Sequence, residues 1–402
     1  MEMIKVTFPD GSVHEFEKGV KILDVAISIS EGFARNVIGA VVNDDIIKGL
    51  SETLKEDCTV KFVKFEDKEG KEIFWHTSSH VMALAIQRLF PDTKFGIGPA
   101  IENGFYYDLD SEHKFTPEDL EKIEAEMKKI VKEGYSVDRK EVDRDFALKY
   151  FAEKGQDYKI DLIEGFAKDA ELSFYELGEF TDLCRGPHLV DVKKIKAVKL
   201  LSIAGAYWRG SEKNKMLQRI YGITFEKKKD LDEYLEFLED AKQRDHRKIG
   251  KELGIFMISQ NVGAGLPFWL PKGATIRRVV ERYIVDKEIE CGYEHVYTPI
   301  LANVDLYKTS GHWDHYQDSM FPPMDLGNGE LLVLRPMNCP HHMEIYNNDV
   351  HSYKEFPIRI AELGMMHRYE MSGTLSGLQR VREMTLNDAH IFVRPDQIKE
   401  EL

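Results

Sequence analysis

Four side chains that can bind a metal or move a proton stand in two short motifs of the sequence. His76 and His80 are four residues apart in a run with helical periodicity, which places both imidazoles on one face of a helix. Far along the chain, Cys184 and His188 flank an Arg-Gly-Pro turn. Three imidazoles and a thiolate suit tetrahedral zinc, and they also suit a metal-free site in which a histidine activates water against an ester. Buried histidines that are satisfied by the backbone are the structural alternative.

A second group of reactive residue types lies near the end of the sequence. Arg368 and Glu370 form an Arg-x-Glu pair, and Arg380 follows beyond a loop that contains Gly373 and Gly377. A guanidinium can meet a phosphate oxygen on which negative charge builds, as when pyrophosphate is displaced from ATP. An Arg-x-Glu pair alone is more often a surface ion pair. Its combination with the two glycines and Arg380 favours the nucleotide interpretation.

The elements that must position these side chains fall into four segments, so we expect an α+β multidomain fold. The first segment is a small mixed sheet with one crossing helix, and Asp10-Gly11 predicts its first hairpin. The second is an α+β domain with helices over residues 73–90 and 116–133. A charged linker helix follows, and then a domain with a long amphipathic helix over residues 275–292. The expected bounds are 1–64, 65–226, 227–253 and 254–402.

The composition excludes several classes of protein. The chain has 402 residues and a formal net charge of −15, which argues against nonspecific coating of nucleic acid, because such binding depends on phosphate neutralisation. No apolar run is long enough to span a membrane, and the start lacks a signal peptide. The four cysteines stand far apart and do not indicate a disulfide framework. We therefore expect a cytoplasmic protein with reduced thiols and no membrane partner.

These motifs resemble, along the whole chain, the bacterial-type threonyl-tRNA synthetases of class II. Residues 1–64 resemble the ubiquitin-like β-grasp module of this family, and the two His/Cys motifs resemble its editing domain. The resemblance implies hydrolysis by these four side chains without metal, whereas the related alanyl group holds zinc at the same set. The other positions that match the editing pattern are Lys159, Asp182 and either Tyr106 or Tyr107.

The last segment resembles the antiparallel-sheet catalytic domain of class II synthetases, incomplete at its carboxyl end. Residues 291–301 resemble motif 1, which implies a homodimer in the intact protein, and the Arg-x-Glu strand with its loop resembles motif 2. By this resemblance Arg368 would contact the α-phosphate of ATP and Glu370 the adenine amino group. Arg380 would hold the γ-phosphate. ATP would enter with Mg²⁺.

The resemblance also implies a zinc ion in this domain. Cys339 and His390 match two of the family's three ligands, and the third is expected beyond the last residue of this chain. Zinc in this family binds the amine and hydroxyl of threonine. Asp388 would pair with the substrate ammonium, and Met337 would line the pocket. Because two protein ligands make a poor zinc site, we expect weak zinc binding or none. Two neighbours that do not match the pattern are His341 and His342.

The expected function is that of a threonyl-tRNA synthetase: ATP-dependent activation of threonine, its transfer to threonine tRNA, and hydrolytic editing of mischarged serine. Serine lacks only one methyl group of threonine, a difference of about 1–3 kcal/mol or roughly 10–200-fold, so a second sieve is required. For these 402 residues we expect editing to be retained and aminoacylation to be lost, as in a chain cut off within its catalytic domain.

Two other functions are compatible with parts of the sequence. Residues 1–64 could be the active part of a regulatory binding module, but such proteins lack the adjoining His/Cys motifs and motif 2. The chain could also be a free-standing deacylase that retains remnants of a synthetase. Motif 2 resembles prolyl- and seryl-type enzymes as well, but the spacing of Cys339 and His390 favours the threonyl type.

Overall fold

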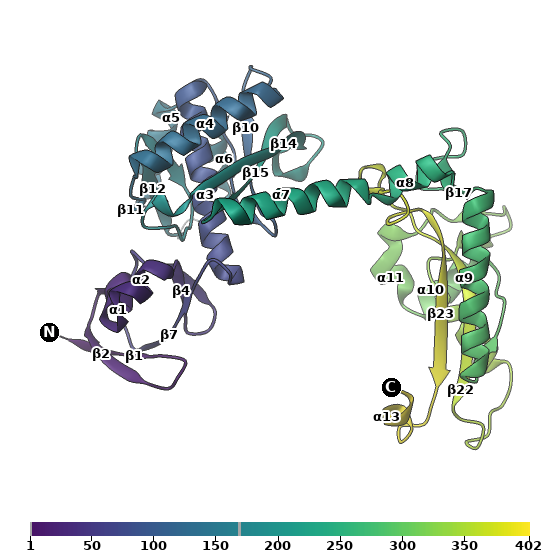
Figure 1. The fold of residues 1–402 in the computed structure, drawn as a ribbon. Helices are drawn as coiled ribbons and strands as arrows, with labels where there is room; N and C mark the ends of the chain where they lie inside the picture. Colours follow the sequence, from purple (N-terminus) through teal and green to yellow (C-terminus); the bar gives the residue numbers. More distant parts are fainter. Residues whose placement is uncertain (1, 168–169) are drawn as a thin grey trace. The chain divides into compact units, whose positions relative to one another are not determined.

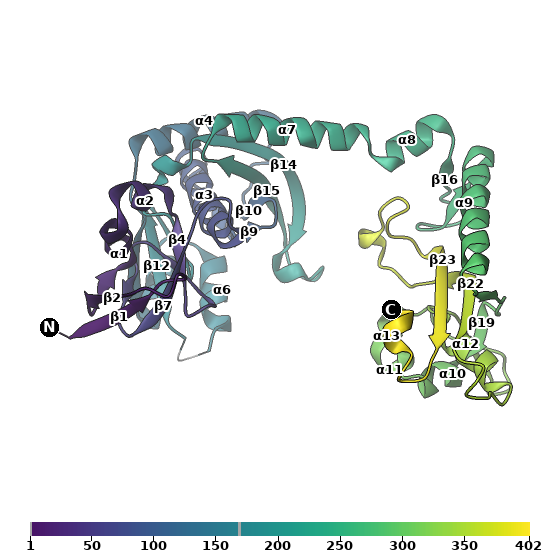
Figure 2. The ribbon, with the colours of Figure 1, turned by 60° about the horizontal axis from the view of Figure 1, so that its bottom comes forward.

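A computed structural model describes residues 2–167 and 170–402. The chain divides into two compact units, Met1–Phe237 and Leu238–Leu402, each of which mixes helices with mainly antiparallel sheets (Figures 1 and 2). The expected α+β class is therefore confirmed. Within the two described ranges, no helix is both long and apolar enough to cross a membrane. The division into four segments with the bounds given above stays a prediction.

The first unit begins with a five-stranded mixed sheet in the order β2-β1-β7-β4-β5. Strands β1 and β2 form the hairpin predicted at Asp10-Gly11, where Gly11 has a φ of +82°. Helix α1 crosses the sheet and buries Val25 and Ala26 in the core beneath it. This is the ubiquitin-like arrangement that we expected. The elements are β1 (Met3–Thr7), β2 (Val13–Glu17), β3 (Val20–Lys21), α1 (Ile22–Ile29), α2 (Glu31–Asn36), β4 (Gly39–Val42), β5 (Ile46–Gly49), β6 (Thr53–Leu54) and β7 (Cys58–Val63).

The rest of the first unit is built around helix α3 (Lys68–Leu89), whose central residues are nearly all buried. It contacts α4 (Pro117–Glu133) and strands of both sheets described below. Helix α4 begins where the sequence predicts, because the Asp119 carboxylate accepts a hydrogen bond from the Thr116 backbone N–H at 3.1 Å. Helix α3 begins before the predicted residue 73. Charged residues in the first turn do not end a helix, so α3 extends back to Lys68.

Two sheets enclose α3. One has the order β14-β15-β10-β8, with β9 paired to β10, and the other has the order β11-β12-β13. Figure 1 shows α3 between α4 and these strands. The remaining elements are β8 (Lys94–Phe95), β9 (Ala100–Ile101), β10 (Gly104–Asp110), β11 (Asp138–Val142), α5 (Arg144–Glu153), α6 (Asp157–Gly165), β12 (Leu172–Leu177), β13 (Phe180–Leu183), β14 (Ala197–Tyr207) and β15 (Met216–Phe225), with short 3₁₀ helices at Val192–Lys194 and Trp208–Gly210.

The charged segment that we expected as one linker helix is divided into α7 (Lys228–Gln243) and α8 (His246–Leu253). The division occurs because Asp245 caps the second helix: its carboxylate accepts a hydrogen bond from the Arg247 backbone N–H at 2.8 Å. Helical periodicity alone did not reveal this cap.

The second unit is organised around the long antiparallel pair of β22 (Ile358–His367) and β23 (Glu383–Phe392), with β18 parallel to β22. Figure 2 shows these two strands beside α9 (Pro271–Glu290), the helix predicted over 275–292. The other elements are β16 (Phe256–Ile258), β17 (Pro267–Trp269), β18 (Glu294–His295), β19 (Leu301–Asn303), α10 (Val304–Thr309), α11 (His312–Tyr316), β20 (Met324–Asp325), β21 (Leu331–Leu334), α12 (Cys339–Asn347) and α13 (Ile398–Glu401), with 3₁₀ helices at Gln317–Ser319 and Ser372–Thr374.

Candidate functional site

The two His/Cys motifs of the first unit meet in one place, and His76, His80, Cys184 and His188 are called the four-residue cluster below. Their potential ligand atoms all lie within 4.8 Å of one another. The ring of His188 is central, with its centroid 4.2 Å from that of His76 and 4.3 Å from that of His80. Its Nε2 lies 3.1 Å from the Cys184 sulfur. The structure thus brings together the four residues that the sequence proposed as one site.

Two elements position the four-residue cluster. Helix α3 carries its first two histidines one turn apart, and the turn after β13 carries Cys184 and His188. This turn is tied to β12, because the Cys184 carbonyl accepts a hydrogen bond from the Ser173 hydroxyl at 2.7 Å. Gly186 is required in the turn: its φ is +69°, and an added Cβ would lie 2.0 Å from the Tyr175 hydroxyl. The conformation of the Arg-Gly-Pro turn therefore determines where Cys184 and His188 lie relative to the histidines of α3.

Burial controls the charge of the four-residue cluster. His80 and His188 are only 1% and 3% exposed. Removal from water lowers the pKa of His76 to about 4 and that of His80 to about 3, although the Asp182 carboxylate opposes both shifts. Burial also lowers the pKa of His188 well below its usual range and raises that of the Cys184 thiol. At neutral pH the cluster therefore holds neutral imidazoles and a neutral thiol.

A buried ion pair lies against the four-residue cluster. Lys159 and Asp182, each 2% exposed, form a salt bridge, and Asp182 also accepts a hydrogen bond from the Tyr107 hydroxyl. The other side of Asp182 faces His80, whose Nε2 lies 3.3 Å from Oδ2. Burial opposes ionisation of Asp182, but Lys159 and these partners outweigh it and lower its pKa.

The structure distinguishes the two tyrosines that the sequence left open. Tyr107 is fully buried in the ion-pair network, and its hydroxyl accepts a hydrogen bond from Lys159 Nζ at 3.1 Å. Tyr106 faces away from it, with the Arg219 guanidinium 3.8 Å from its ring centre. Consecutive residues of a strand point to opposite faces, so only one of the pair can reach the cluster.

Two residues near the four-residue cluster carried no signal in the sequence. The hydroxyl of Thr77, which is fully buried, lies 3.2 Å from His188 Nδ1. At Gly49 in β5, an added Cβ would meet the His188 carbonyl oxygen at 3.0 Å. Both contacts join distant parts of the chain, so only the folded structure reveals them.

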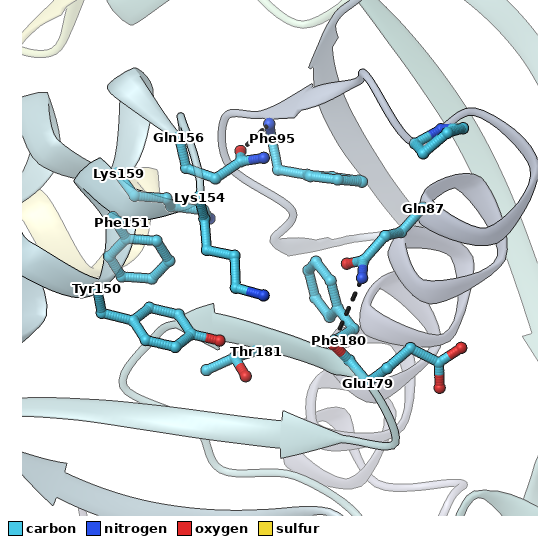
Figure 3. A pocket seen from close by; sticks show the side chains of 11 residues that line it. Gln87, Phe95, Tyr150, Phe151, Lys154, Gln156, Lys159, Glu179, Phe180 and Thr181 are labelled. Carbon is cyan, nitrogen blue, oxygen red and sulfur yellow. Dashed lines mark hydrogen bonds between the residues drawn. The ribbon is translucent and has the colours of Figure 1, made fainter.

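A hollow of about 300 Å³ lies beside this site (Figure 3). Tyr150 of α5 and Lys154, the residue that follows this helix, face into it from one side, and Gln87 of α3 lies on the other. The described residues that line it include Lys159 but none of the four-residue cluster. Lys159 of the buried ion pair and Phe180, whose ring centre is 5.9 Å from that of His80, therefore lie between the hollow and the cluster.

The second unit brings together Cys339, Asp388 and His390, called the three-residue cluster below. Their ligand atoms also lie within 4.8 Å of one another. All three are only partly buried. Burial raises the pKa of Cys339 and lowers that of His390, with Asp388 acting against the second shift. The residues that the sequence proposed for zinc and for the substrate ammonium therefore adjoin. Met337 lies two positions before Cys339, just ahead of α12.

His342, which does not match the family's ligand pattern, is in direct contact with the three-residue cluster. Its Nδ1 lies 2.9 Å from His390 Nδ1, and its Nε2 lies 3.3 Å from Glu362 Oε2. Glu362 is in turn paired with the buried Arg335 at 3.2 Å. With His342 donating to the carboxylate, its Nδ1 accepts the His390 Nδ1–H, which leaves His390 Nε2 with a free lone pair. This arrangement is typical of a metal-ligating histidine.

The residues proposed for ATP lie in the loop that joins β22 to β23. Glu370 accepts a hydrogen bond from Arg380 Nε at 2.8 Å, and the Arg368 backbone N–H donates to the Arg382 carbonyl at 3.0 Å. Glu370 therefore pairs with Arg380 across the loop, whereas the alternative interpretation was an ion pair within the Arg-x-Glu motif itself. Arg382, which the sequence did not single out, also donates to the Glu370 carbonyl at 3.0 Å.

Three family models match parts of the chain. Residues 4–64 match the TGS domain. Residues 172–221 match the threonyl and alanyl tRNA synthetase second additional domain. Residues 324–402 match the tRNA synthetase class II core domain (G, H, P, S and T).

Curated relatives match the chain along its whole length. The threonine–tRNA ligase of Geobacillus sp. (strain WCH70) is 62% identical over 400 residues, which is 100% of this chain and 62% of the relative. Threonine–tRNA ligase 1 of Bacillus subtilis (strain 168) is 61% identical with the same coverage. The chain thus spans about three fifths of the length of these relatives. A solved structure, the RNA binding domain of threonyl-tRNA synthetase from Cryptosporidium parvum Iowa II, is 42% identical over 39% of each chain with a TM-score of 0.38.

Proposed function

The chain belongs to the threonyl-tRNA synthetase family, and we propose that its four-residue cluster hydrolyses the ester that joins serine to mischarged threonine tRNA. The observation that carries this proposal is the enclosed set of neutral imidazoles beside the Lys159–Asp182 ion pair. Strongly shifted pKa values caused by burial and a specific charge partner are typical of catalytic sites.

The choice of serine follows from the limits of recognition. A site that selects threonine by its hydroxyl rejects valine strongly, but serine keeps the hydroxyl. The missing methyl group contributes about 1–3 kcal/mol of discrimination. A hydrolytic site separate from the synthetic one removes the serine that passes the first selection.

The chemistry requires a base for water and a support for the developing positive charge on that base. His80 is oriented for this role, because its Nε2 faces Asp182 while its Nδ1 has no hydrogen-bond partner among the described residues. With Nε2 protonated, the Nδ1 lone pair accepts a proton from water as the water attacks the ester carbonyl. Asp182 then stabilises the imidazolium, as a buried carboxylate does in other histidine-based sites. As the ester C–O bond breaks, the imidazolium returns the proton to the departing ribose oxygen of the tRNA, which releases serine and restores the neutral ring. Lys159 keeps Asp182 ionised.

The same four donors also fit zinc by type, since three imidazoles and a thiolate form a tetrahedral set. The unpartnered His80 Nδ1 is compatible with either use. The family resemblance favours hydrolysis without metal, and we propose that reaction. A zinc held by only three of these donors would supply a water of lowered pKa at its fourth position, whereas a zinc held by all four would be structural.

Release of the amino acid from charged tRNA tests the proposal. Incubation of the chain with threonine tRNA charged with serine is expected to release serine, and the threonine-charged form is expected to remain largely intact. His80→Ala and Cys184→Ala are expected to abolish serine release, whereas Ser111→Ala on an exposed loop leaves it unchanged. Absence of hydrolysis by the wild type, or equal loss of threonine, contradicts the proposal.

For the second unit we propose the synthetic chemistry of the family: activation of threonine with ATP and Mg²⁺, and transfer to threonine tRNA. Cys339 and His390 would hold zinc, which supplies a Lewis acid for the amine and hydroxyl of threonine. Asp388 would bind the ammonium, and Arg368 would contact the α-phosphate. Weaker binding of ATP with Mg²⁺ to Arg368→Ala than to the wild type is expected in a titration. That these residues alone do not aminoacylate stays a prediction, which threonine-dependent ATP–pyrophosphate exchange would contradict.

We further propose that the protein forms a homodimer through α9. This helix exposes Val279, Val280 and Tyr283 to at least 58%, which is unusual for large apolar side chains that neighbour one another on a helix. Sedimentation of the chain is expected to show a dimer.

A further inference from the structure

Thr77 lies between His76 and His80 in the sequence, and its own contacts indicate a further role. Its hydroxyl has three neighbours: the Ile73 carbonyl at 2.8 Å, the Leu189 backbone N–H at 2.9 Å and His188 Nδ1 at 3.2 Å. Thr77 is fully buried, so water does not compete for these contacts. A hydroxyl has one proton to donate and two lone pairs to accept with.

The distances and the partners decide where the hydroxyl proton lies. The Ile73 carbonyl cannot donate and Leu189 N–H can only donate, so the remaining question is the direction of the bond to His188. The carbonyl contact is the shorter of the two candidate acceptor contacts, 2.8 Å against 3.2 Å. With the proton on that contact, the hydroxyl accepts from both Leu189 N–H and His188 Nδ1–H. All three contacts are then hydrogen bonds.

The other side of the His188 ring supports the same assignment. Its Nε2 lies 3.1 Å from the Cys184 sulfur. A thiol is a weak donor, and its sulfur is a weaker acceptor than oxygen or nitrogen. If Nε2 carried the proton, its N–H would face only that sulfur, inside a site where unpaired donors are costly. If Nδ1 carries the proton, the thiol S–H donates to the Nε2 lone pair.

We propose that Thr77 is a positioning residue that holds His188 in the tautomer with Nδ1 protonated, so that the Nε2 lone pair faces the four-residue cluster. The same hydroxyl fixes the backbone after His188 through Leu189 N–H. The link between Thr77 and His188 therefore joins helix α3 to the turn after β13 and sets both the place and the protonation pattern of the central ring. The expected effect of Thr77 on hydrolysis rests on the proposed function, whereas the assignment of the His188 tautomer is independent of that function.

The direct test is the ring-nitrogen NMR spectrum of His188 in histidine-labelled full-length chain at neutral pH, which separates protonated from unprotonated ring nitrogens. The expected result for the wild type is a protonated Nδ1 and an unprotonated Nε2. Thr77→Val, which keeps the shape and removes the acceptor, is expected to shift the ring to the other tautomer. Thr77→Ser restores the acceptor and is expected to restore the wild-type pattern. A wild-type His188 protonated on Nε2 overturns the proposal, whether or not the valine variant folds.

Hydrolysis of serine-charged threonine tRNA gives the second measurement. Thr77→Val is expected to lower kcat by about 10–100-fold, the usual cost of losing a partner that orients a functional histidine, with KM unchanged because the buried Thr77 does not face the substrate. Thr77→Ser keeps most of kcat. The matched control is Ser78→Ala, since Ser78 is the next residue of α3, equally buried, and its hydroxyl bonds only Phe74 and Thr224 among the residues that the structure describes.

The two measurements separate the possible failures. If the wild type hydrolyses nothing, the proposed function fails while the NMR result still decides the tautomer. If Thr77→Val and Ser78→Ala lower kcat equally, or if Thr77→Val raises KM alone, Thr77 has only a structural role and the inference is wrong.

Discussion

The two His/Cys clusters of this chain contain similar residue types in opposite surroundings. The four-residue cluster is enclosed, and its rings are held by protein groups: Thr77 on His188, Asp182 on His80 and Cys184 on His188 again. The three-residue cluster is only partly buried, and it is supported from one side by His342 and Glu362. An enclosed cluster presents neutral groups that are already oriented for proton transfer. A partly open one leaves room for an ion or a substrate.

The largest expected difference between the two clusters is the loss of stability when a charged neighbour is removed. Lys159→Met leaves the Asp182 carboxylate buried without its cation, which is expected to lower the free energy of unfolding by about 3–5 kcal/mol. Asp388→Asn changes a partly exposed carboxylate of the three-residue cluster and is expected to cost less than about 0.5 kcal/mol. Urea unfolding monitored by circular dichroism measures both. Equal effects of the two substitutions contradict the difference in burial.

Acid is expected to act mainly on the four-residue cluster. Its histidines stay neutral in the folded state, with a pKa of about 4 for His76 and about 3 for His80, while an unfolded histidine titrates near 6.5. The unfolded state therefore binds more protons, and the stability present above pH 6.5 is lost as the pH falls toward 4. Between pH 6.5 and 5 the loss is about 2 kcal/mol per histidine. Urea unfolding across this range tests it, and His80→Leu should flatten the slope.

Zinc binding is expected to depend on the three-residue cluster and not on the four-residue cluster. Any zinc that the chain binds at Cys339 and His390 is expected to be lost in Cys339→Ser and retained in Cys184→Ser. His342→Ala is expected to weaken the binding by roughly 10–100-fold, since the ring that orients His390 is removed. The control is His341→Ala, because the ring nitrogens of His341 have no partner among the described residues. Competition with a chromogenic chelator measures the affinities, and retention of zinc by Cys339→Ser contradicts this assignment.

The smallest effect on serine release is expected where Gly49 of the β-grasp sheet contacts the turn that carries His188. Gly49→Ala places a Cβ 3.0 Å from the His188 carbonyl oxygen, so the turn that carries His188 must move by a few tenths of an ångström. A few-fold loss of serine release is expected, because displacements of this size at a catalytic group lower the rate. Gly32→Ala, whose added Cβ would have only the Ser30 hydroxyl at 3.9 Å, is the control. Equal rates for both variants would show that the contact does not matter.

Local spacing was enough to predict several parts of this molecule. The two histidines of α3 lie on one face because they are four residues apart, and the Asp10-Gly11 hairpin and the start of α4 depend on neighbouring residues alone. The residue types of the two motifs already suggested one site, and the resemblance to the family added the residues of the ion pair. These features need no knowledge of the tertiary structure beyond the family's pattern.

The rest could not be read from the sequence, for physical reasons. Tyr106 and Tyr107 occupy opposite faces of β10, and the sequence does not say which face is inside. Thr77 has no motif of its own, because its role depends on a ring that is 111 residues away. His342 was passed over for the same reason: its contacts with His390 and Glu362 are between separate elements.

The pH dependence of serine release tests the central claim most directly. The rate constant for hydrolysis of serine-charged threonine tRNA by the wild type would be measured from pH 7 to pH 5.5, with the uncatalysed rate subtracted and folding checked by circular dichroism. Because burial keeps the imidazoles of the four-residue cluster neutral across this range, the rate is expected to change by less than about twofold. A fall of about tenfold, which a base with the ordinary histidine pKa of 6.5 would give, would contradict hydrolysis by an enclosed neutral cluster.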